Sequence, residues 1–225
     1  MQLEEAPAND NDAPLVSSAD AANGEGVSCW SDKELFKAPP PRDACPICPL
    51  PLSCKEVTYQ DCCGKMLCSG CFYADAAENI IRDICPFCRT PEHSSDEEYI
   101  DRFKKRAEGG DAEAMHVLGS YYTRAEFGLP QNYERGITLL LRAGELGCAE
   151  ANCNIGIAYD DCGDGVERDT KKSTHYYELA AMGGHVGARH NLGVDEDEAG
   201  NKKRALKHWM IAAGAGYDKS LKEIR

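Results

Sequence analysis

The motif Ala-x-x-x-Leu/Ile-Gly occurs three times, as Ala114-Met-His-Val-Leu-Gly119, Ala151-Asn-Cys-Asn-Ile-Gly156 and Ala188-Arg-His-Asn-Leu-Gly193. Successive copies are separated by 37 residues. A fixed period of this length is typical of a repeat architecture, in which each unit buries its apolar face only against its neighbours. The motif therefore predicts that most of the chain is a stack of similar units.

The second half of each unit also repeats, because Ala143 and Gly147 correspond to Ala180 and Gly184. Each unit is predicted to be helix, loop, helix, with Ala and Gly where helices approach closely and larger side chains such as Leu139 and Tyr176 in the gaps. The stack is thus an α-solenoid.

The ends of the helical region follow the same pattern. A helix over 95–108 is predicted to begin after Ser94 and Ser95, with an acidic first turn, and to act as a half-unit before the 132–145 helix. Leu221 and Ile224 are expected to pack on the third repeat.

Eight cysteines upstream of the repeats fall in four pairs. Three of the pairs have the spacing C-x-x-C, which lets two thiolates reach one tetrahedral zinc. The segment is too short for a hydrophobic core alone, so metal would supply folding energy, on the order of 10–16 kcal/mol per structural zinc. The pairs are Cys45 and Cys48, Cys62 and Cys63, Cys68 and Cys71, and Cys85 and Cys88.

Composition narrows the class of protein. The formal net charge of −13 and pI near 4.9 argue against binding to nucleic acid or to an anionic membrane surface. No apolar run approaches the ~18 residues needed to cross a bilayer, and the acidic start resembles no secretory leader. We expect a cytoplasmic or nuclear protein, where thiols stay reduced.

Residues 1–43 are rich in Ala, Asn, Asp, Pro and Glu, and we interpret them as a disordered acidic tail. Within the tail, the stretch from Val27 to Phe36 is either a docking motif for a partner or, as we favour, a segment that touches the zinc module through Trp30.

The helical region, residues 94–225, resembles Sel1-like repeats, which are relatives of tetratricopeptide repeats. The residues that carry the resemblance are the Ala-x3-Leu/Ile-Gly motif, the Ala-x3-Gly that closes each unit, and the loop Gly163-Asp-Gly-Val-Glu-Arg-Asp169. The resemblance implies a superhelical surface that binds proteins and carries no catalytic residues.

The cysteine segment, residues 44–92, resembles a RING finger, in which two zinc ions are bound in a cross-brace. The resemblance implies two Zn²⁺ as cofactors, each with four ligands. It implies that the first zinc is held by Cys45, Cys48, Cys68 and Cys71, and the second by Cys62, Cys63, Cys85 and Cys88.

The ligand set of the second zinc has alternatives. The histidine common in RING fingers is missing, and in one register Lys65 takes its place; lysine is a poor ligand because its amine is protonated near neutral pH. An all-cysteine register with Cys62 and Cys63 is favoured, and Cys54 is a spare candidate.

RING resemblance also implies an activity. Most RING fingers are ubiquitin ligases that orient a ubiquitin-charged conjugating enzyme (E2) for attack by a substrate lysine, without a covalent nucleophile. The resemblance implies that Ile47 and Pro86 contact the conjugating enzyme and that Arg89 bridges it to ubiquitin. The repeats would then recruit a protein substrate.

A non-catalytic, zinc-stabilised adaptor or scaffold is the alternative. It is favoured by the lack of a groove tryptophan after Cys71, where Phe72 and Tyr73 stand instead.

Other candidate side chains carry less weight. The histidines of the repeats are predicted to be mostly exposed, and the run from Asp195 to Glu198 to be a solvated loop. Three further cysteines are predicted to be small core residues or free thiols, namely Cys148, Cys153 and Cys162.

Overall fold

The computed structural model describes residues 30–41, 43–52, 57–78, 84–161 and 166–225. The chain is mainly helical, and none of the helices in these residues is long and apolar enough to cross a membrane. The disordered tail predicted for residues 1–43 therefore lies mostly outside the described part of the chain. Cys54 and residues 163–165 of the loop from Gly163 to Asp169 also lie outside it.

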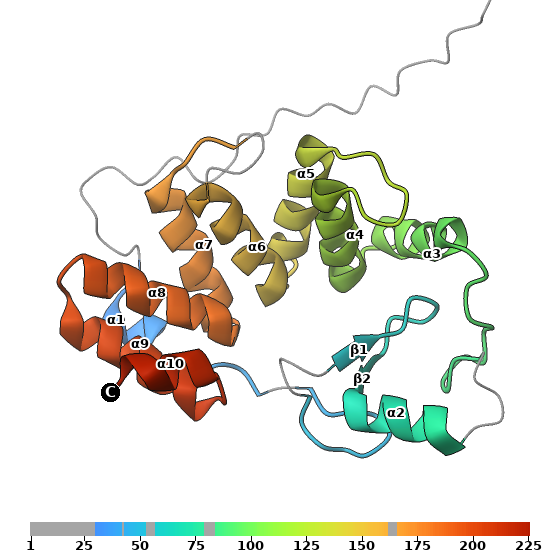
Figure 1. Ribbon diagram of the computed structural model, residues 1–225, viewed down its shortest axis with the longest axis horizontal. Coiled ribbons are helices and arrows are strands. Elements are labelled where there is room, and N and C mark those ends of the chain that lie inside the picture. The colour runs from blue at the N-terminus through green and yellow to red at the C-terminus, as the bar shows by residue number, and fades with distance from the viewer. Residues whose placement is uncertain (1–29, 42, 53–56, 79–83, 162–165) are drawn as a thin grey trace, which may run out of the picture.

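Eight consecutive helices form the arc seen in Figure 1. Each helix packs mainly on the next one, as expected for a solenoid. The helices are α3 (Asp96–Glu108), α4 (Ala112–Arg124), α5 (Tyr133–Glu145), α6 (Ala149–Asp160), α7 (Thr170–Met182), α8 (Val186–Glu198), α9 (Lys202–Gly214) and α10 (Asp218–Glu223).

The motif glycines lie where paired helices approach closely, as predicted. A Cβ atom on Gly156 would stand 2.6 Å from the ring of Tyr177, and one on Gly119 would stand 2.9 Å from a backbone oxygen of α5 and 3.0 Å from Leu140. Tyr177 and Leu140 are 2 % exposed. The close contacts therefore come mainly from the residues directly after Tyr176 and Leu139.

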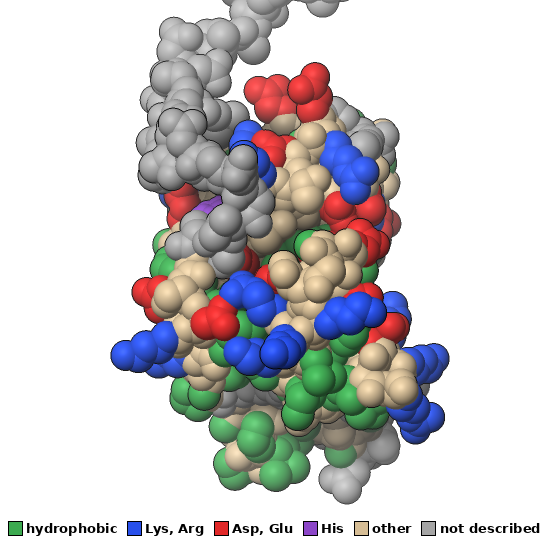
Figure 2. All heavy atoms as spheres, turned by 90° about the vertical axis from the view of Figure 1, so that its left-hand side faces the viewer, with side chains coloured by type: hydrophobic (Ala, Val, Ile, Leu, Met, Phe, Trp, Pro, Cys, Tyr) green, Lys and Arg blue, Asp and Glu red, His purple; other side chains and the backbone are tan. Residues whose placement is uncertain are grey.

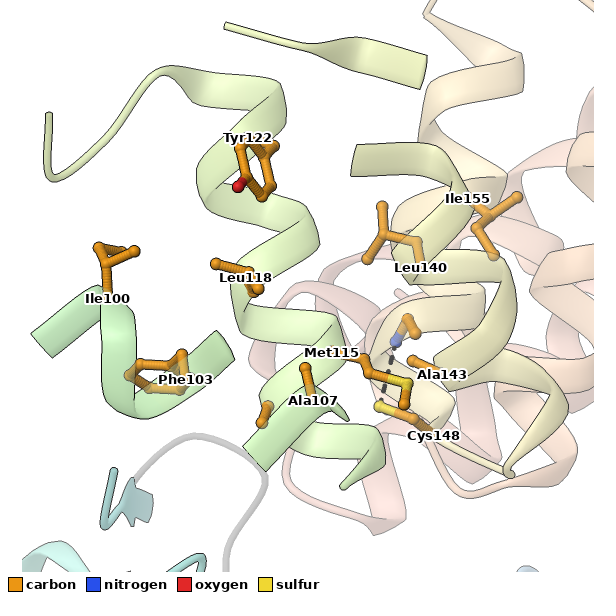
Figure 3. Packing of buried hydrophobic residues seen from close by; sticks show 12 residues of the cluster. Ile100, Phe103, Ala107, Met115, Leu118, Tyr122, Leu140, Ala143, Cys148 and Ile155 are labelled. Atoms are coloured by element: carbon orange, nitrogen blue, oxygen red, sulfur yellow. Dashed lines mark hydrogen bonds between the residues drawn. The ribbon is translucent and has the colours of Figure 1, made fainter. Parts of the chain in front are cut away.

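One continuous core joins α3 to α6, and Figure 3 shows its side chains pointing into the space between these helices. Phe103 of α3, Leu118 of α4, and Ala143 of α5 are buried in it. Units are joined by tight turns at Gly147 and Gly184, which have φ of +91° and +95°. Such values suit glycine because other residues meet a steric penalty there.

The predicted start of the helical region is confirmed. Ser95 caps α3 by accepting a hydrogen bond from the backbone N–H of Glu98 at 3.2 Å. The other end differs from expectation, since Leu221 is 50 % exposed and Ile224 is 37 % exposed rather than packed on the third repeat. The run from Asp195 to Glu198 is also no loop, because it forms the last turn of α8.

The cysteine segment is a small separate layer below the arc. Strands β1 (Val57–Tyr59) and β2 (Met66–Cys68) form an antiparallel hairpin with Thr58 opposite Leu67, and α2 (Ser69–Glu78) follows directly. Two short loops, 44–51 and 84–91, flank this unit and are each closed by a bridge at their ends.

This layer docks on α3 through the hairpin. The ring of Tyr59 stacks on Phe103 at 5.6 Å, and its hydroxyl donates to Asp111 at 2.8 Å. Arg106 donates to the same hydroxyl at 2.7 Å, and Arg102 donates to Asp61 at 3.2 Å. Polar and aromatic contacts thus hold the cysteine layer against the start of the solenoid.

At the other end of the arc, a single helical turn, α1 (Asp32–Leu35), packs on α7 and lies beside α8 and α9 (Figure 1). Leu35 is 1 % exposed, and Trp30 and Phe36 pack in the same cluster as Tyr177. The expectation that Trp30 touches the zinc module is therefore wrong, because its apolar partners belong to the repeats. The segment after α1 then runs to the cysteine layer.

Buried Arg189 explains why this short turn is held. Its guanidinium donates to the backbone oxygen of Leu35 at 2.6 Å and to that of Ala181 at 2.8 Å. Arg204 and Lys207 both pair with Asp32. The α1 turn is thus held on the repeats by a hydrogen bond from Arg189 to its backbone and by ion pairs at Asp32.

Candidate metal centre

Four thiols converge at the base of the hairpin. Cys45 and Cys48 come from the first loop, Cys68 ends β2, and Cys71 lies in the first turn of α2. All four sulfur atoms lie within 4.8 Å of one another, and those of Cys48 and Cys68 are 3.6 Å apart. These are the four residues that the RING resemblance assigns to one zinc.

A second group of four thiols forms at the tip of the hairpin. Cys62 and Cys63 occupy the turn between the strands, and Cys85 and Cys88 come from the loop 84–91. Their sulfur atoms also lie within 4.8 Å of one another, with Cys62 and Cys88 3.4 Å apart and Cys63 and Cys85 3.7 Å apart. In sequence order, the first cysteine pair thus groups with the third pair, and the second pair groups with the fourth.

The geometry suits a tetrahedral ion. Four thiolates at about 2.3 Å from one zinc stand about 3.8 Å from each other. The three sulfur pairs above have separations of 3.4 to 3.7 Å, close to that edge. All described cysteines are free thiols rather than disulfides. Both cysteine groups could therefore hold metal ions.

The two CPxC loops are built alike. The backbone N–H of Cys45 donates to the oxygen of Leu50 at 2.8 Å, and that of Cys85 donates to the oxygen of Thr90 at 2.9 Å. Each hydrogen bond closes its loop, and both cysteine sulfur atoms of the loop point into the same thiol group.

Thiol crowding sets the electrostatics of these groups. The pKa of Cys71 is raised to about 12, first by its hydrogen bond with Cys48 and then by burial. Burial and the neighbouring thiols raise the pKa of Cys62 well above its usual range. In contrast, backbone N–H groups of Cys68 and Cys48 lower the pKa of Cys45 to about 6. A divalent cation would remove the mutual repulsion, since metal ligation deprotonates thiols outright.

The residues that the RING resemblance assigns to the conjugating enzyme are on the surface. Ile47 is 48 % exposed, and Pro86 and Arg89 are also exposed. Phe72 follows Cys71 directly and is 40 % exposed. Ile47 and Phe72 therefore flank the same cysteine group with apolar surface that the module does not bury.

Lys65 takes no part in either group. Its ammonium lies 5.0 Å from the centre of the Phe87 ring, a cation–π contact.

The burial predicted for side chains of the repeats is correct for the cysteines and wrong for one histidine. His208 is fully buried, and neither ring nitrogen has a hydrogen-bond partner in the described structure, so the prediction of an exposed histidine is wrong there. Cys148 and Cys153 are buried, as predicted. Cys162 lies outside the described residues.

Sequence reasoning missed a third group of ligand-type side chains. Glu113, His116 and Cys148 bring one ligand atom each within 4.8 Å of one another. The repeat period is the signal in the sequence that could have found this group. Cys148 lies 37 residues after Asp111, so it caps α6 as Asp111 caps α4, and the two helix starts are neighbours in the stack.

Comparison with known proteins identifies the helical units. Residues 112–148 and 149–185 each match the family model of the Sel1 repeat. A Sel1 repeat protein from Oxalobacter formigenes is 29 % identical, with a TM-score of 0.52 over 57 % of this chain and 53 % of that one.

A protective antigen present in uropathogenic Escherichia coli strains, which displays an SLR fold, is 27 % identical. Its TM-score is 0.54 over 60 % of this chain and 29 % of that one. The chain thus spans about half the length of the first of these proteins and under a third of the second.

These likenesses support the solenoid and leave the resemblance of residues 44–92 to a RING finger unconfirmed. The two matched units follow one another without a gap, and the described helices on both sides continue the same stack. Residues 112–185 are therefore two Sel1 repeats within a mainly helical solenoid.

Proposed function

We propose that this protein is a scaffold for protein–protein interaction, in which a zinc-stabilised module is held rigidly against Sel1 repeats. The observation that carries this proposal is the pair of Sel1 units at 112–185, since such repeats imply protein partners. No independent catalytic pocket is needed for this role. Reduced thiols in both cysteine groups fit the cytoplasm or nucleus.

Zinc is the metal that we propose for the two cysteine groups. A tetrahedral set of four thiolates suits Zn²⁺ or an iron–sulfur cluster. The CPxC loops and the hairpin leave the sulfur atoms at the spacing of a single ion, about 3.8 Å. Metal analysis of the purified chain should therefore find two zinc ions in the cysteine layer, whereas iron with acid-labile sulfide would refute the assignment.

A protein partner has a suitable surface at the C-terminal end of the arc. Leu206 and Met210 of α9 and Leu221 and Ile224 near α10 are all exposed. Figure 2 shows Lys and Arg side chains across the middle of this face and hydrophobic side chains gathered below them. The combination favours a partner segment that is both apolar and acidic.

Affinity capture with matched variants tests this role. Met210→Glu places a carboxylate in the apolar patch, and Ile157→Glu makes the same change at an exposed site on α6. We expect a specific partner that wild type and Ile157→Glu retain and that Met210→Glu loses, with helical circular dichroism unchanged in both. Equal capture by all three proteins would refute the proposed surface.

Ubiquitin ligation is the second candidate function. The observation that favours it is the exposure of Ile47 at 48 % beside Phe72 at 40 %, next to one cysteine group. In a ligase, Ile47 and Pro86 would contact the ubiquitin-charged conjugating enzyme. The planar guanidinium of Arg89 would donate to carbonyls of both proteins. The repeats would recruit the substrate.

Discharge of ubiquitin from a panel of charged conjugating enzymes separates the two functions. A ligase should accelerate discharge, and Ile47→Ala and Arg89→Ala should each abolish the acceleration. Leu50→Ala is the matched control, because Leu50 is 63 % exposed in the same loop. No acceleration by protein that carries its full zinc content would eliminate the ligase and leave the scaffold.

A further inference from the structure

A cavity of about 520 Å³ lies between the cysteine layer and the first turns of α4, α6 and α8. Its wall includes Glu113, Cys148, Glu150 and His185. Cys148 stands at the N-cap of α6, where its Sγ accepts a hydrogen bond from the backbone N–H of Ala151 at 3.4 Å (Figure 3).

The distances around Cys148 are those of an ion site. Its Sγ is 3.7 Å from Oε2 of Glu113, and Oε1 of the same carboxylate is 3.3 Å from Nδ1 of His116. In a tetrahedral zinc site with ordinary bond lengths, sulfur and oxygen ligands stand about 3.5 Å apart, and nitrogen and oxygen ligands about 3.3 Å apart. One ligand atom of each of the three residues lies within 4.8 Å of the other two, so the group is compact enough to converge on one ion.

The other ring nitrogen of His116, Nε2, also has a polar neighbour. The side-chain amide of Asn154 lies 3.1 Å from Nε2 of His116 and 3.1 Å from Oγ of Ser120. The oxygen and nitrogen of an amide can be exchanged by a 180° turn. With its oxygen inward, Asn154 accepts from both groups, which leaves the Nδ1 lone pair of His116 for a metal. Metal-bound histidines usually have such a partner.

The local charge favours a cation. Cys148 lies near two carboxylates, because its sulfur is 3.7 Å from Oε2 of Glu113 and 3.8 Å from Oε2 of Glu150. Within the described residues, neither Glu113 nor Glu150 forms an ion pair with a lysine or arginine. Two carboxylates beside a buried thiol therefore have no lysine or arginine partner among the described residues.

The next junction between repeats provides an internal comparison. Moving by 37 residues takes Glu113 to Glu150, His116 to Cys153, and Cys148 to His185, which are again metal-ligating types. Nδ1 of His185 accepts from the backbone N–H of Ala188 at 3.0 Å, as Sγ of Cys148 does from Ala151, but these three side chains form no compact group among the described residues. Of the two junctions compared, the first brings its three ligand atoms together and the second, in the part of the chain that the structure describes, does not.

We propose that Glu113, His116 and Cys148 form a third metal site, for Zn²⁺ by the chemistry of its ligands, which links the start of α4 to the N-cap of α6. Three protein ligands leave one coordination position, which is available to water or to an anionic group in the cavity. Glu150 stays outside the first ligand set and adds negative charge. The site does not depend on the function of the cysteine layer.

The test counts zinc on the full chain. Wild type, Cys148→Ser, Glu113→Gln and Cys153→Ser are equilibrated in a zinc buffer, passed through gel filtration and measured by elemental analysis. Serine is a good N-cap, so Cys148→Ser should keep α6 intact, and Glu113→Gln keeps the shape of the side chain. Cys153→Ser changes a buried cysteine at the neighbouring junction and serves as the matched control.

We expect both site variants to bind one zinc fewer per chain than wild type, and Cys153→Ser to bind as many as wild type. Substitution with Co²⁺ gives a second readout, since the spectrum of wild type minus that of Cys148→Ser should show a one-thiolate tetrahedral site, apart from the four-thiolate bands of the two cysteine groups. Equal zinc content in wild type, Cys148→Ser and Glu113→Gln would overturn the proposal. A loss in Cys153→Ser equal to theirs would overturn it as well.

Discussion

His208 offers a sharp test of how α1 is held. Its ring is fully buried, packs against Phe36 in a tilted arrangement with ring centroids 4.7 Å apart, and has no hydrogen-bond partner within the described structure. Burial lowers the pKa of His208 to about 3, with Arg189, Arg204 and Lys207 adding to the shift. The folded protein therefore keeps this ring neutral.

The sign of the pH effect follows from the lowered pKa. Between pH 6.5 and 3 the unfolded chain binds a proton at His208 that the folded chain does not, so stability is lost as pH falls through this window. Between pH 7 and pH 5 the titration of His208 lowers the free energy of unfolding by about 2 kcal/mol. Asp195 acts with the opposite sign, because burial and then nearby Asp160 raise its pKa to about 6.

Asp195 is present in both wild type and His208→Leu, so its contribution to the pH dependence cancels when the two proteins are compared. We expect the variant to be at least as stable as wild type at pH 7, since two unpaired buried nitrogens are removed, and to lose about 2 kcal/mol less on going to pH 5. Urea unfolding followed by helical circular dichroism measures both values.

A graded control uses His190→Asn. Burial also lowers the pKa of His190, but this ring is less buried and pairs with Ser220. It should remove a smaller part of the pH dependence. Equal pH dependence in wild type and His208→Leu would refute the assignment of a neutral, desolvated ring beside α1.

Asp111→Ala should cost about 3 kcal/mol in urea unfolding, about 1 from the α4 cap and about 2 from charge-assisted hydrogen bonds with Tyr59 of the cysteine layer and Arg106 of α3. Asp111→Asn keeps the cap, so an equal loss in both variants would contradict this division. Cys63→Ser should remove about one zinc per chain in elemental analysis, and unchanged zinc content would exclude Cys63 as a ligand. Gly156→Ala should destabilise the protein by about 1–2 kcal/mol because its methyl group meets Tyr177. Gly214→Ala meets nothing within 4 Å and should stabilise α9 by up to about 1 kcal/mol, so equal shifts in their thermal midpoints would refute the close-packing argument.

Local pattern was enough to predict much of this fold. The 37-residue period predicts the helical pairs and their close-packed glycines, because each unit contacts mainly its sequence neighbours. The side chains that contact those glycines are less predictable. Gly156 is contacted by Tyr177 instead of Tyr176, and Gly119 is approached more closely by Leu140 than by Leu139, because residues one apart on a helix differ in direction by about 100°.

The sequence alone determined the spacing of the cysteine pairs and the period of the repeats, since both are set within short stretches of chain. Only the tertiary structure decided which distant groups meet. The α1 turn docks on the last repeats through Arg189, 154 residues away, and Cys148 meets Glu113 and His116 because one solenoid unit is laid against the next. The physical reason is that these contacts depend on the cumulative rotation of stacked helices, which local sequence pattern does not specify.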